Sequence, residues 1–188
     1  MIDIEKIGHF ANIPRYAAET LAALNESILH LAGLHCPVIA EVQGALTGGA
    51  LGLVLAADLV VMTPGAFIQP WYAVVGFAPD GGWTRMMAAR IGAHRLRALH
   101  VLNGRIEAEE ALLLGLAQAV NPRTEDQVAL WLTQIARHDA GSIGATKTLL
   151  AEDLAESLEA ERAAFIARID LPEVRDGMAR FLQSRKDG

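Results

Sequence analysis

Apolar positions between Pro14 and Leu34 recur every three to four residues, which predicts an amphipathic helix. Two short runs further on, Val38–Val42 and Asp58–Met62, are mostly apolar and rich in β-branched residues, as buried parallel strands are. The segment between them, Ala50–Ala57, is an apolar run of helical length. A strand, a helix and a second strand in this order predict a βαβ unit, and therefore a fold of the α/β class.

The pattern continues with two short candidate strands, Ala66–Gln69 and Ala117–Val120. Between them, the sequence Pro79-Asp80-Gly81-Gly82 predicts a loop. Asp80 stands where an N-cap residue would begin a helix that runs towards Ile91. An Asp in that place needs no chemical role, because capping alone explains it.

Helices dominate the sequence after residue 92. The predicted helices cover residues 93–102, 108–114, 125–138, 143–150, 154–169 and 172–185. Asn121-Pro122 marks the expected boundary between an α/β core, residues 1–122, and a helical C-terminal region, residues 123–188. The charged run from Glu152 to Arg162 is typical of a solvated helix face with ion pairs one turn apart.

Composition excludes several classes of protein. The 188 residues carry 16 Lys and Arg against 22 Asp and Glu, a formal net charge of −6, which argues against a nucleic-acid-binding protein. The single cysteine cannot form an internal disulfide, and the histidines show no metal-ligand spacing, so we expect no metal site. The first residues lack a leader pattern, and the longest apolar stretch is too short to span a bilayer. We therefore expect a cytoplasmic protein that binds no membrane, and its 52% hydrophobic content suggests surface reserved for a partner subunit.

Three glycines, Gly44, Gly48 and Gly49, lie between the first predicted strand and the apolar helix that follows it, and a fourth, Gly52, lies in the first turn of that helix. Glycines at a helix start leave backbone N–H groups uncovered at the positive end of the helix dipole, where they can bind an anion or a developing oxyanion. The spacing fits neither a P-loop nor a dinucleotide-binding fingerprint. Close packing between helix and strand is the alternative explanation for small residues here.

Three separated motifs resemble the crotonase (enoyl-CoA hydratase/isomerase) superfamily. The first is the run Cys36–Ala50, CPVIAEVQGALTGGA, which continues through Leu53 to Asp58. The second is LNGRIEAEEA at residues 102–111, followed by Gly115-Leu116 and Val120. The third is RDGMARFLQSR at residues 175–185. They occur in the family's order and are spread over nearly the whole chain.

This resemblance implies a ββα spiral core, C-terminal helices that assemble a homo-oligomer (a trimer or a hexamer), and an acyl-CoA thioester as substrate, with no other cofactor. In the family, two backbone N–H groups hold the thioester oxygen while it gains enolate charge. By position, Gly49 supplies one of them, with Gly48 beside the substrate, and Ile2 is the candidate for the other. The strands that precede that second donor in the family are missing here, so we expect an N-terminally shortened core.

The acid and base residues depart from the hydratase pattern. Gly52 and Tyr72 stand where hydratases carry their two catalytic glutamates. Hydration uses a pair of carboxylates, and a tyrosine with an ordinary pKa near 10 is a poor base at neutral pH, so this pair disfavours ordinary hydratase chemistry. Asp80 lies in a Pro-Asp-Gly sequence that resembles isomerase-like members, in which an aspartate carries a proton along the acyl chain. A partly buried carboxyl would have the raised pKa that this role needs.

The sequence-based hypothesis is therefore an enoyl-CoA isomerase, with Asp80, Gly49 and Tyr72 as catalytic residues. Trp71 and Trp83 lie near them in the sequence and are candidates to line the acyl pocket, although aromatic residues are more commonly part of a core. Two alternatives stay open. One is a non-catalytic acyl-CoA-binding paralogue that acts as an oligomeric interaction protein, and the other is a hydratase with atypical acid and base residues.

Overall fold

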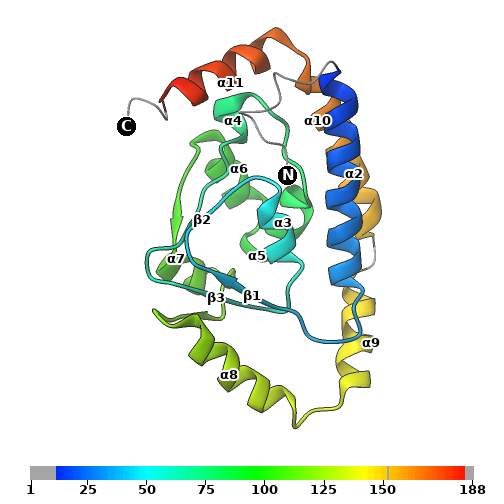
Figure 1. The fold of residues 1–188 in the computed structure, drawn as a ribbon, viewed down its shortest axis with the longest axis vertical. Coiled ribbons are helices and arrows are strands. Elements are labelled where there is room, and N and C mark those ends of the chain that lie inside the picture. The colour runs from blue at the N-terminus through cyan, green and yellow to red at the C-terminus, as the bar shows by residue number, and fades with distance from the viewer. Residues whose placement is uncertain (1–11, 152, 185–188) are drawn as a thin grey trace.

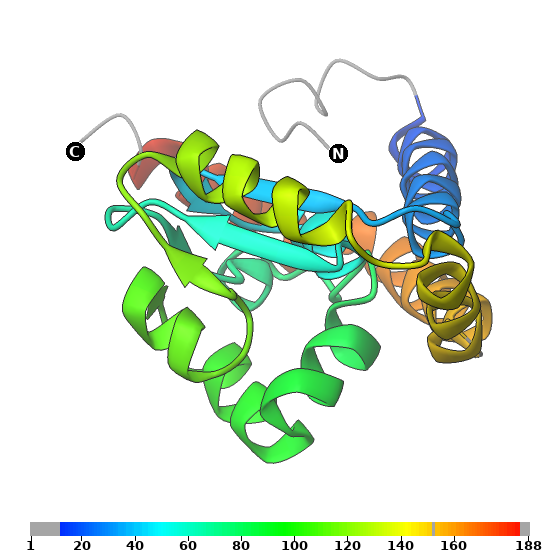
Figure 2. The same ribbon diagram turned by 90° about the horizontal axis from the view of Figure 1, so that it is seen from below.

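The computed structural model describes residues 12–151 and 153–184 as two small sheets surrounded by helices (Figures 1 and 2). In the first sheet β1 (Ile39–Val42), β3 (Leu59–Met62) and β6 (Ala119–Val120) are parallel, with β3 in the centre. Ile39 pairs with Leu59 and Val42 with Met62. The helix α3 (Ala50–Leu55) connects β1 to β3, so the predicted βαβ unit is confirmed.

The second sheet carries three strands of two residues each. Its order is β2-β4-β5, in which β2 and β4 are parallel and β5 is antiparallel to β4. Their bounds are β2 Ala45–Leu46, β4 Phe67–Ile68 and β5 Ile106–Glu107. Of these three strands, the sequence analysis predicts only β4, within the longer stretch Ala66–Gln69.

Most of the helices occupy nearly the positions expected from the sequence, whereas the short helix α4 was not expected. Their bounds are α2 Ile13–Ala32, α4 Tyr72–Val75, α5 Ala88–Ile91, α6 Ala93–Val101, α7 Ala108–Leu113, α8 Thr124–Ile135, α9 Ala140–Leu150, α10 Leu154–Ile169 and α11 Pro172–Ser184. The helix expected after Asp80 differs: it begins as a π-helix, η1 (Trp83–Met87), and continues as α5. Within the described residues, no helix is long and apolar enough to cross a membrane.

The C-terminal helices pack onto the core. α10 lies alongside α2 (Figure 1), where the Asn25 side-chain amide donates to the Leu158 carbonyl at 3.1 Å. α11 crosses α4 so closely that a Cβ on Gly177 would lie 2.1 Å from the Val75 carbonyl oxygen. α8 packs on β3, across the parallel sheet (Figure 2). Residues from both predicted regions of the chain therefore share one hydrophobic core, and α10 reaches the loop that carries Asp80.

Candidate active site

The glycine pair Gly48-Gly49 begins α3. Gly48 has φ +55°, a conformation that glycine adopts without strain, and its α-carbon faces open space. Gly49 is the N-cap of α3, and its backbone N–H has no acceptor among the described residues. Gly49 itself is buried, and its unbonded N–H lies at the positive end of the helix, which favours an anionic oxygen as its acceptor.

Asp80 lies directly against Gly49. A Cβ placed on Gly49 would lie 3.4 Å from Asp80 Oδ2 and 3.6 Å from Oδ1, and only 2.5 Å from the Leu24 side chain. Gly81 packs just as closely, since a Cβ there would lie 3.3 Å from the Gly49 α-carbon. A side chain at position 49 would therefore require the Leu24 side chain to move, and the fold brings together two segments that the sequence analysis selected separately.

Tyr72 completes a buried cluster with Asp80. Its hydroxyl donates a hydrogen bond to Asp80 Oδ1 at 2.5 Å, and the exposed fractions of the two residues are 4% and 7%. Trp83 is also buried, and its ring meets the Tyr72 ring edge-on, with centroids 5.8 Å apart. The aromatic contact fixes the ring, so the phenol points at the carboxyl.

Burial controls the proton affinities in this cluster. Burial raises the pKa of the Asp80 carboxyl to about 6; the hydrogen bond from Tyr72 lowers it, and the negative charge of Glu161 raises it. Burial and the nearby Asp80 charge raise the pKa of Tyr72 well above its ordinary value. At neutral pH Tyr72 therefore keeps its proton and acts as a donor, while Asp80 exchanges a proton near pH 6.

The simple capping explanation for Asp80 is wrong. The N-cap residue of the π-helix η1 is Gly82, so this helix has no side-chain cap. The Gly82 and Thr84 backbone N–H groups instead donate to the carboxylate of Glu161, at 2.6 and 2.7 Å. Asp80 is therefore free to bond with Tyr72.

Glu161 was missed by the sequence analysis, which placed it on a solvated face. The structure buries it, with an exposed fraction of 6%, on the face of α10 that also carries Leu158 and Phe165. Its spacing from those two residues is the signal that could have found it, because residues three and four apart share one face of a helix.

The remaining predicted site residues are distributed differently. Trp71 packs against Phe181 of α11, with ring centroids 5.3 Å apart, and its backbone N–H donates to Asn103 Oδ1 at 2.9 Å. It thus forms part of the contact with α11. Ile2, the candidate second oxyanion donor, lies outside the described residues. Residues 12–151 and 153–184 contain no cluster of His, Cys, Asp and Glu that could hold a metal ion.

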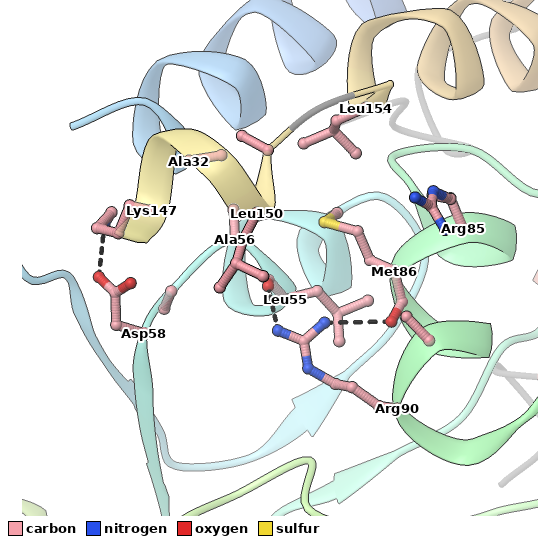
Figure 3. Close-up of a pocket in the computed structure, with 13 residues that line it drawn as sticks. Ala32, Leu55, Ala56, Asp58, Arg85, Met86, Arg90, Lys147, Leu150 and Leu154 are labelled. Carbon is pink, nitrogen blue, oxygen red and sulfur yellow. Dashed lines mark hydrogen bonds and ion pairs between the residues drawn. The ribbon is translucent and has the colours of Figure 1, made fainter. Parts of the chain in front are cut away.

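A separate cavity of about 380 Å³ lies at the opposite, C-terminal end of α3 (Figure 3). The Arg90 guanidinium donates there to the Leu55 carbonyl at 2.6 Å, and Lys147 Nζ donates to Asp58 Oδ2 at 2.5 Å. None of the candidate catalytic residues lines this cavity. It therefore does not belong to the Asp80 cluster.

A model of the enoyl-CoA hydratase/isomerase family matches residues 2–187 of the sequence. The chain belongs to this family. A probable enoyl-CoA hydratase of Rhodobacter capsulatus is 29% identical over 156 residues, which are 79% of this chain and 60% of that protein. The probable enoyl-CoA hydratase EchA12 of Mycobacterium tuberculosis is 34% identical over 166 residues, which are 84% of this chain and 58% of that protein. The chain thus spans about three-fifths of the length of these curated relatives.

Solved structures confirm the crotonase-like fold. An enoyl-CoA hydratase from Mycobacterium avium subsp. paratuberculosis superimposes with a TM-score of 0.83 at 28% identity, over 89% of this chain and 71% of that chain. An enoyl-CoA hydratase from Bacillus halodurans gives a TM-score of 0.85 at 24% identity, over 95% of this chain and 74% of that chain. The second similarity shows the fold alone.

Position 52, where the sequence analysis expects hydratases to carry a glutamate, has no room for a side chain in this structure. A Cβ on Gly52 would lie 2.0 Å from the Gly81 carbonyl oxygen and 2.7 Å from the Ile28 side chain. No side chain fits there with this backbone, so the loop that carries Asp80 occupies the space that a glutamate at position 52 would need.

Proposed function

We propose that this chain is an acyl-CoA enzyme that shifts a carbon–carbon double bond by proton transfer through a thioester enolate. The observation that carries the proposal is the proximity of Asp80 to Gly49, which places one buried carboxyl near a residue whose backbone N–H has no acceptor among the described residues. An enoyl-CoA isomerase needs that pair: a base for the proton on the α-carbon, and a donor for the charge that then develops on the thioester oxygen.

The proposed reaction begins with the Asp80 carboxylate removing a proton from C2 of a 3-enoyl thioester. The C2–H electron pair becomes the C1–C2 double bond of a dienolate, and the Gly49 N–H stabilises the oxygen anion. Protonated Asp80 then returns the proton to C4, the oxygen charge collapses, and the double bond ends between C2 and C3. Atoms and electrons balance within the substrate and Asp80, so this reaction consumes no water and needs no metal ion or redox cofactor.

The properties of the buried pair support this assignment. With a pKa of about 6, Asp80 is mostly ionised at pH 7, and its conjugate acid still gives up a proton readily. Tyr72, whose pKa is raised well above the ordinary value, holds the carboxyl in place as a hydrogen-bond donor and keeps its own proton. The low exposure of both side chains also keeps bulk water away from the Asp80 carboxyl.

The competing reading as a hydratase receives less support from the same residues. A second carboxyl near Asp80 is present in Glu161, but its oxygens already accept from Gly82 and Thr84. Position 52 has no room for one. Hydration needs two carboxyl groups, and among the described residues of this cluster only Asp80 is available for it.

A conjugation assay tests the proposal. The protein is mixed with a 3-enoyl-CoA, and the absorbance of the conjugated 2-enoyl thioester is followed for wild type, Asp80→Asn and the control Asp170→Asn, whose exposed carboxylate pairs with Arg175. We expect turnover to fall at least about 100-fold in Asp80→Asn and to persist in the control. Equal turnover in both variants would contradict the assignment of Asp80.

Two further outcomes distinguish the alternatives in the same experiment. Acyl-CoA binding without turnover by the wild type would favour a non-catalytic binding protein. Loss of absorbance from a 2-enoyl-CoA, with a 3-hydroxyacyl product, would favour hydration.

A further inference from the structure

Glu161 links the C-terminal helical region to the segment that carries Asp80. One carboxylate oxygen, Oε2, accepts from the Gly82 N–H at 2.6 Å. The other, Oε1, accepts from the Thr84 N–H at 2.7 Å and from the Thr84 hydroxyl at 2.5 Å. This side chain crosses from α10 to bind Gly82 and Thr84, just after the Asp80-Gly81 turn, so it acts where a local cap residue would otherwise stand.

The bonded segment has little rigidity of its own. Gly81 and Gly82 both have positive φ, +66° and +80°, and consecutive glycines gain many conformations when they are released. Gly81 also supplies the surface that packs against Gly49. A carboxylate that fixes Gly82 and Thr84 therefore fixes the direction in which the Asp80 side chain leaves the turn.

The charge of Glu161 reaches Asp80 as well. The titratable groups that face Asp80 from the packed elements are Tyr72 on α4 and Glu161 on α10, and both contribute to the proton affinity of its carboxyl. His100 on α6 stacks on the Tyr72 ring with centroids 6.4 Å apart, and burial lowers its pKa, which favours the neutral imidazole. Glu161 is thus the anionic group in this set that acts on Asp80.

We propose that Glu161 is a positioning residue for the Asp80 reaction: it holds the Gly82–Thr84 backbone so that the Asp80 carboxyl meets both Tyr72 and Gly49, and it places a second negative charge beside that carboxyl. This inference rests on the proposed isomerase function. It also assigns α10 a role in the site, in addition to its packing against α2.

Three variants separate positioning from simple stabilisation. Glu161→Gln removes the charge and one acceptor, Glu161→Asp keeps the charge but shortens the reach to Gly82 and Thr84, and Thr84→Val removes the hydroxyl bond while leaving the carboxylate. We expect Glu161→Gln to move the acidic midpoint of the kcat/KM profile downward, because a like charge that favoured protonated Asp80 is gone. Thr84→Val should leave that midpoint unchanged.

The Glu161→Asp variant should affect kcat and KM differently. In Glu161→Asp we expect kcat to fall about 10-fold or more with little change in KM, because the carboxyl of Asp80 loses its alignment while substrate contacts remain. A wild-type kcat in Glu161→Asp would overturn the positioning role, and an unmoved midpoint in Glu161→Gln would overturn the electrostatic role. If Glu161→Gln fails to fold, the Glu161→Asp measurement still decides the first point.

A readout that is independent of activity keeps this inference distinguishable from the proposed function. The carboxyl carbon of Asp80, assigned by comparison with Asp80→Asn, is titrated by ¹³C NMR in wild type, Glu161→Gln and Thr84→Val. We expect a midpoint near 6 in the wild type and a lower one only in Glu161→Gln. Equal midpoints in all three would contradict the coupling, whereas a shifted midpoint in a protein without isomerase activity would contradict the proposed function alone.

Discussion

The Tyr72 hydroxyl donates to Asp80 Oδ1 at 2.5 Å inside the protein, and each partner changes the proton affinity of the other. The bond stabilises the ionised form of Asp80, while burial of the pair stabilises the protonated form. Because burial is the larger effect, the carboxyl keeps a pKa of about 6. The balance of these two effects leads to the first two predictions.

Replacing Tyr72 by Phe should raise the pKa of Asp80 above its wild-type value, because the donor that favours the carboxylate is removed while the burial remains. The acidic limb of the kcat/KM profile should move to higher pH, and the free energy of unfolding should fall by about 1–3 kcal/mol because a buried acceptor loses its partner. Kinetics from pH 4.5 to 8 and urea unfolding check both parts. An acidic limb that moves to lower pH would contradict the account of the pair.

Stability should depend on pH through Asp80 in a stated direction. Its folded-state pKa lies above the value of an unfolded aspartate, so the folded protein binds the proton more tightly than the unfolded chain does. The stabilisation is fully present below about pH 4 and is lost as the pH rises through about 6, up to about 3 kcal/mol in total. Urea unfolding of wild type and Asp80→Asn across this range measures the effect. The unfolding free energy of the wild type should fall relative to that of Asp80→Asn as the pH rises through this window.

Gly49→Ala should damage the site sterically. The new methyl would lie 2.5 Å from the Leu24 side chain and 3.4 Å from Asp80 Oδ2, so we expect a loss of about 1–3 kcal/mol and a fall in isomerase turnover. Gly65→Ala is the matched control, because a Cβ there meets nothing within 4 Å. If both variants behave alike in unfolding and turnover, the close packing of Gly49 on Asp80 is not what the reaction requires.

Restoring the hydratase pattern at position 52 should fail. A Cβ on Gly52 meets the Gly81 carbonyl oxygen at 2.0 Å, so even Gly52→Ala should destabilise the fold by more than about 2 kcal/mol and displace the Asp80 turn. Gly44→Ala, with open space around the new methyl, should change stability by less than about 1 kcal/mol. Thermal unfolding of the two variants makes the comparison, and a stable Gly52→Ala protein would show that the loop can move aside.

The α8 helix should contribute to a homo-oligomer, which we propose is a trimer or a hexamer. Leu130 and Leu132 are 52% and 55% exposed in the single chain, and covering them with a partner subunit would remove apolar surface from water. The double variant Leu130→Glu/Leu132→Glu should lower the mass measured by light scattering, whereas Gln134→Glu on the same helix should not. An unchanged mass in the double variant would place the contact elsewhere.

Local patterns predicted most of the fold. β1, α3 and β3 could be recognised because apolar period and turn signals are set by neighbouring residues, and the crotonase-like motifs lie in the same segment. The prediction that the Gly49 N–H binds the thioester oxygen also came from that motif. β2 and β5 each pair with β4, and two residues are too few to show a period of their own.

Two features of the site depended on distant contacts that the sequence does not display. Asp80 has the local signature of an N-cap, but its side chain turns to Tyr72 because Glu161 already accepts from Gly82 and Thr84. Glu161 has the local signature of a solvated helix, because its burial depends on where α10 packs rather than on its neighbours in the sequence. A charged residue is normally exposed, but it can be buried where hydrogen-bond donors inside the fold pair with its side chain, and such donors cannot be recognised from the neighbouring sequence.

The most direct test of the account follows the migrating proton itself. A 3-enoyl-CoA carrying deuterium at C2 is converted in ordinary water, and the 2-enoyl product is analysed by mass spectrometry and NMR for deuterium at C4, with wild type and Asp80→Asn side by side. If buried Asp80 carries the proton, the wild-type product retains part of the deuterium at C4, and Asp80→Asn forms product at least about 100-fold more slowly. A product free of deuterium at C4, formed equally fast by both proteins, would contradict the claim that Asp80 transfers the proton.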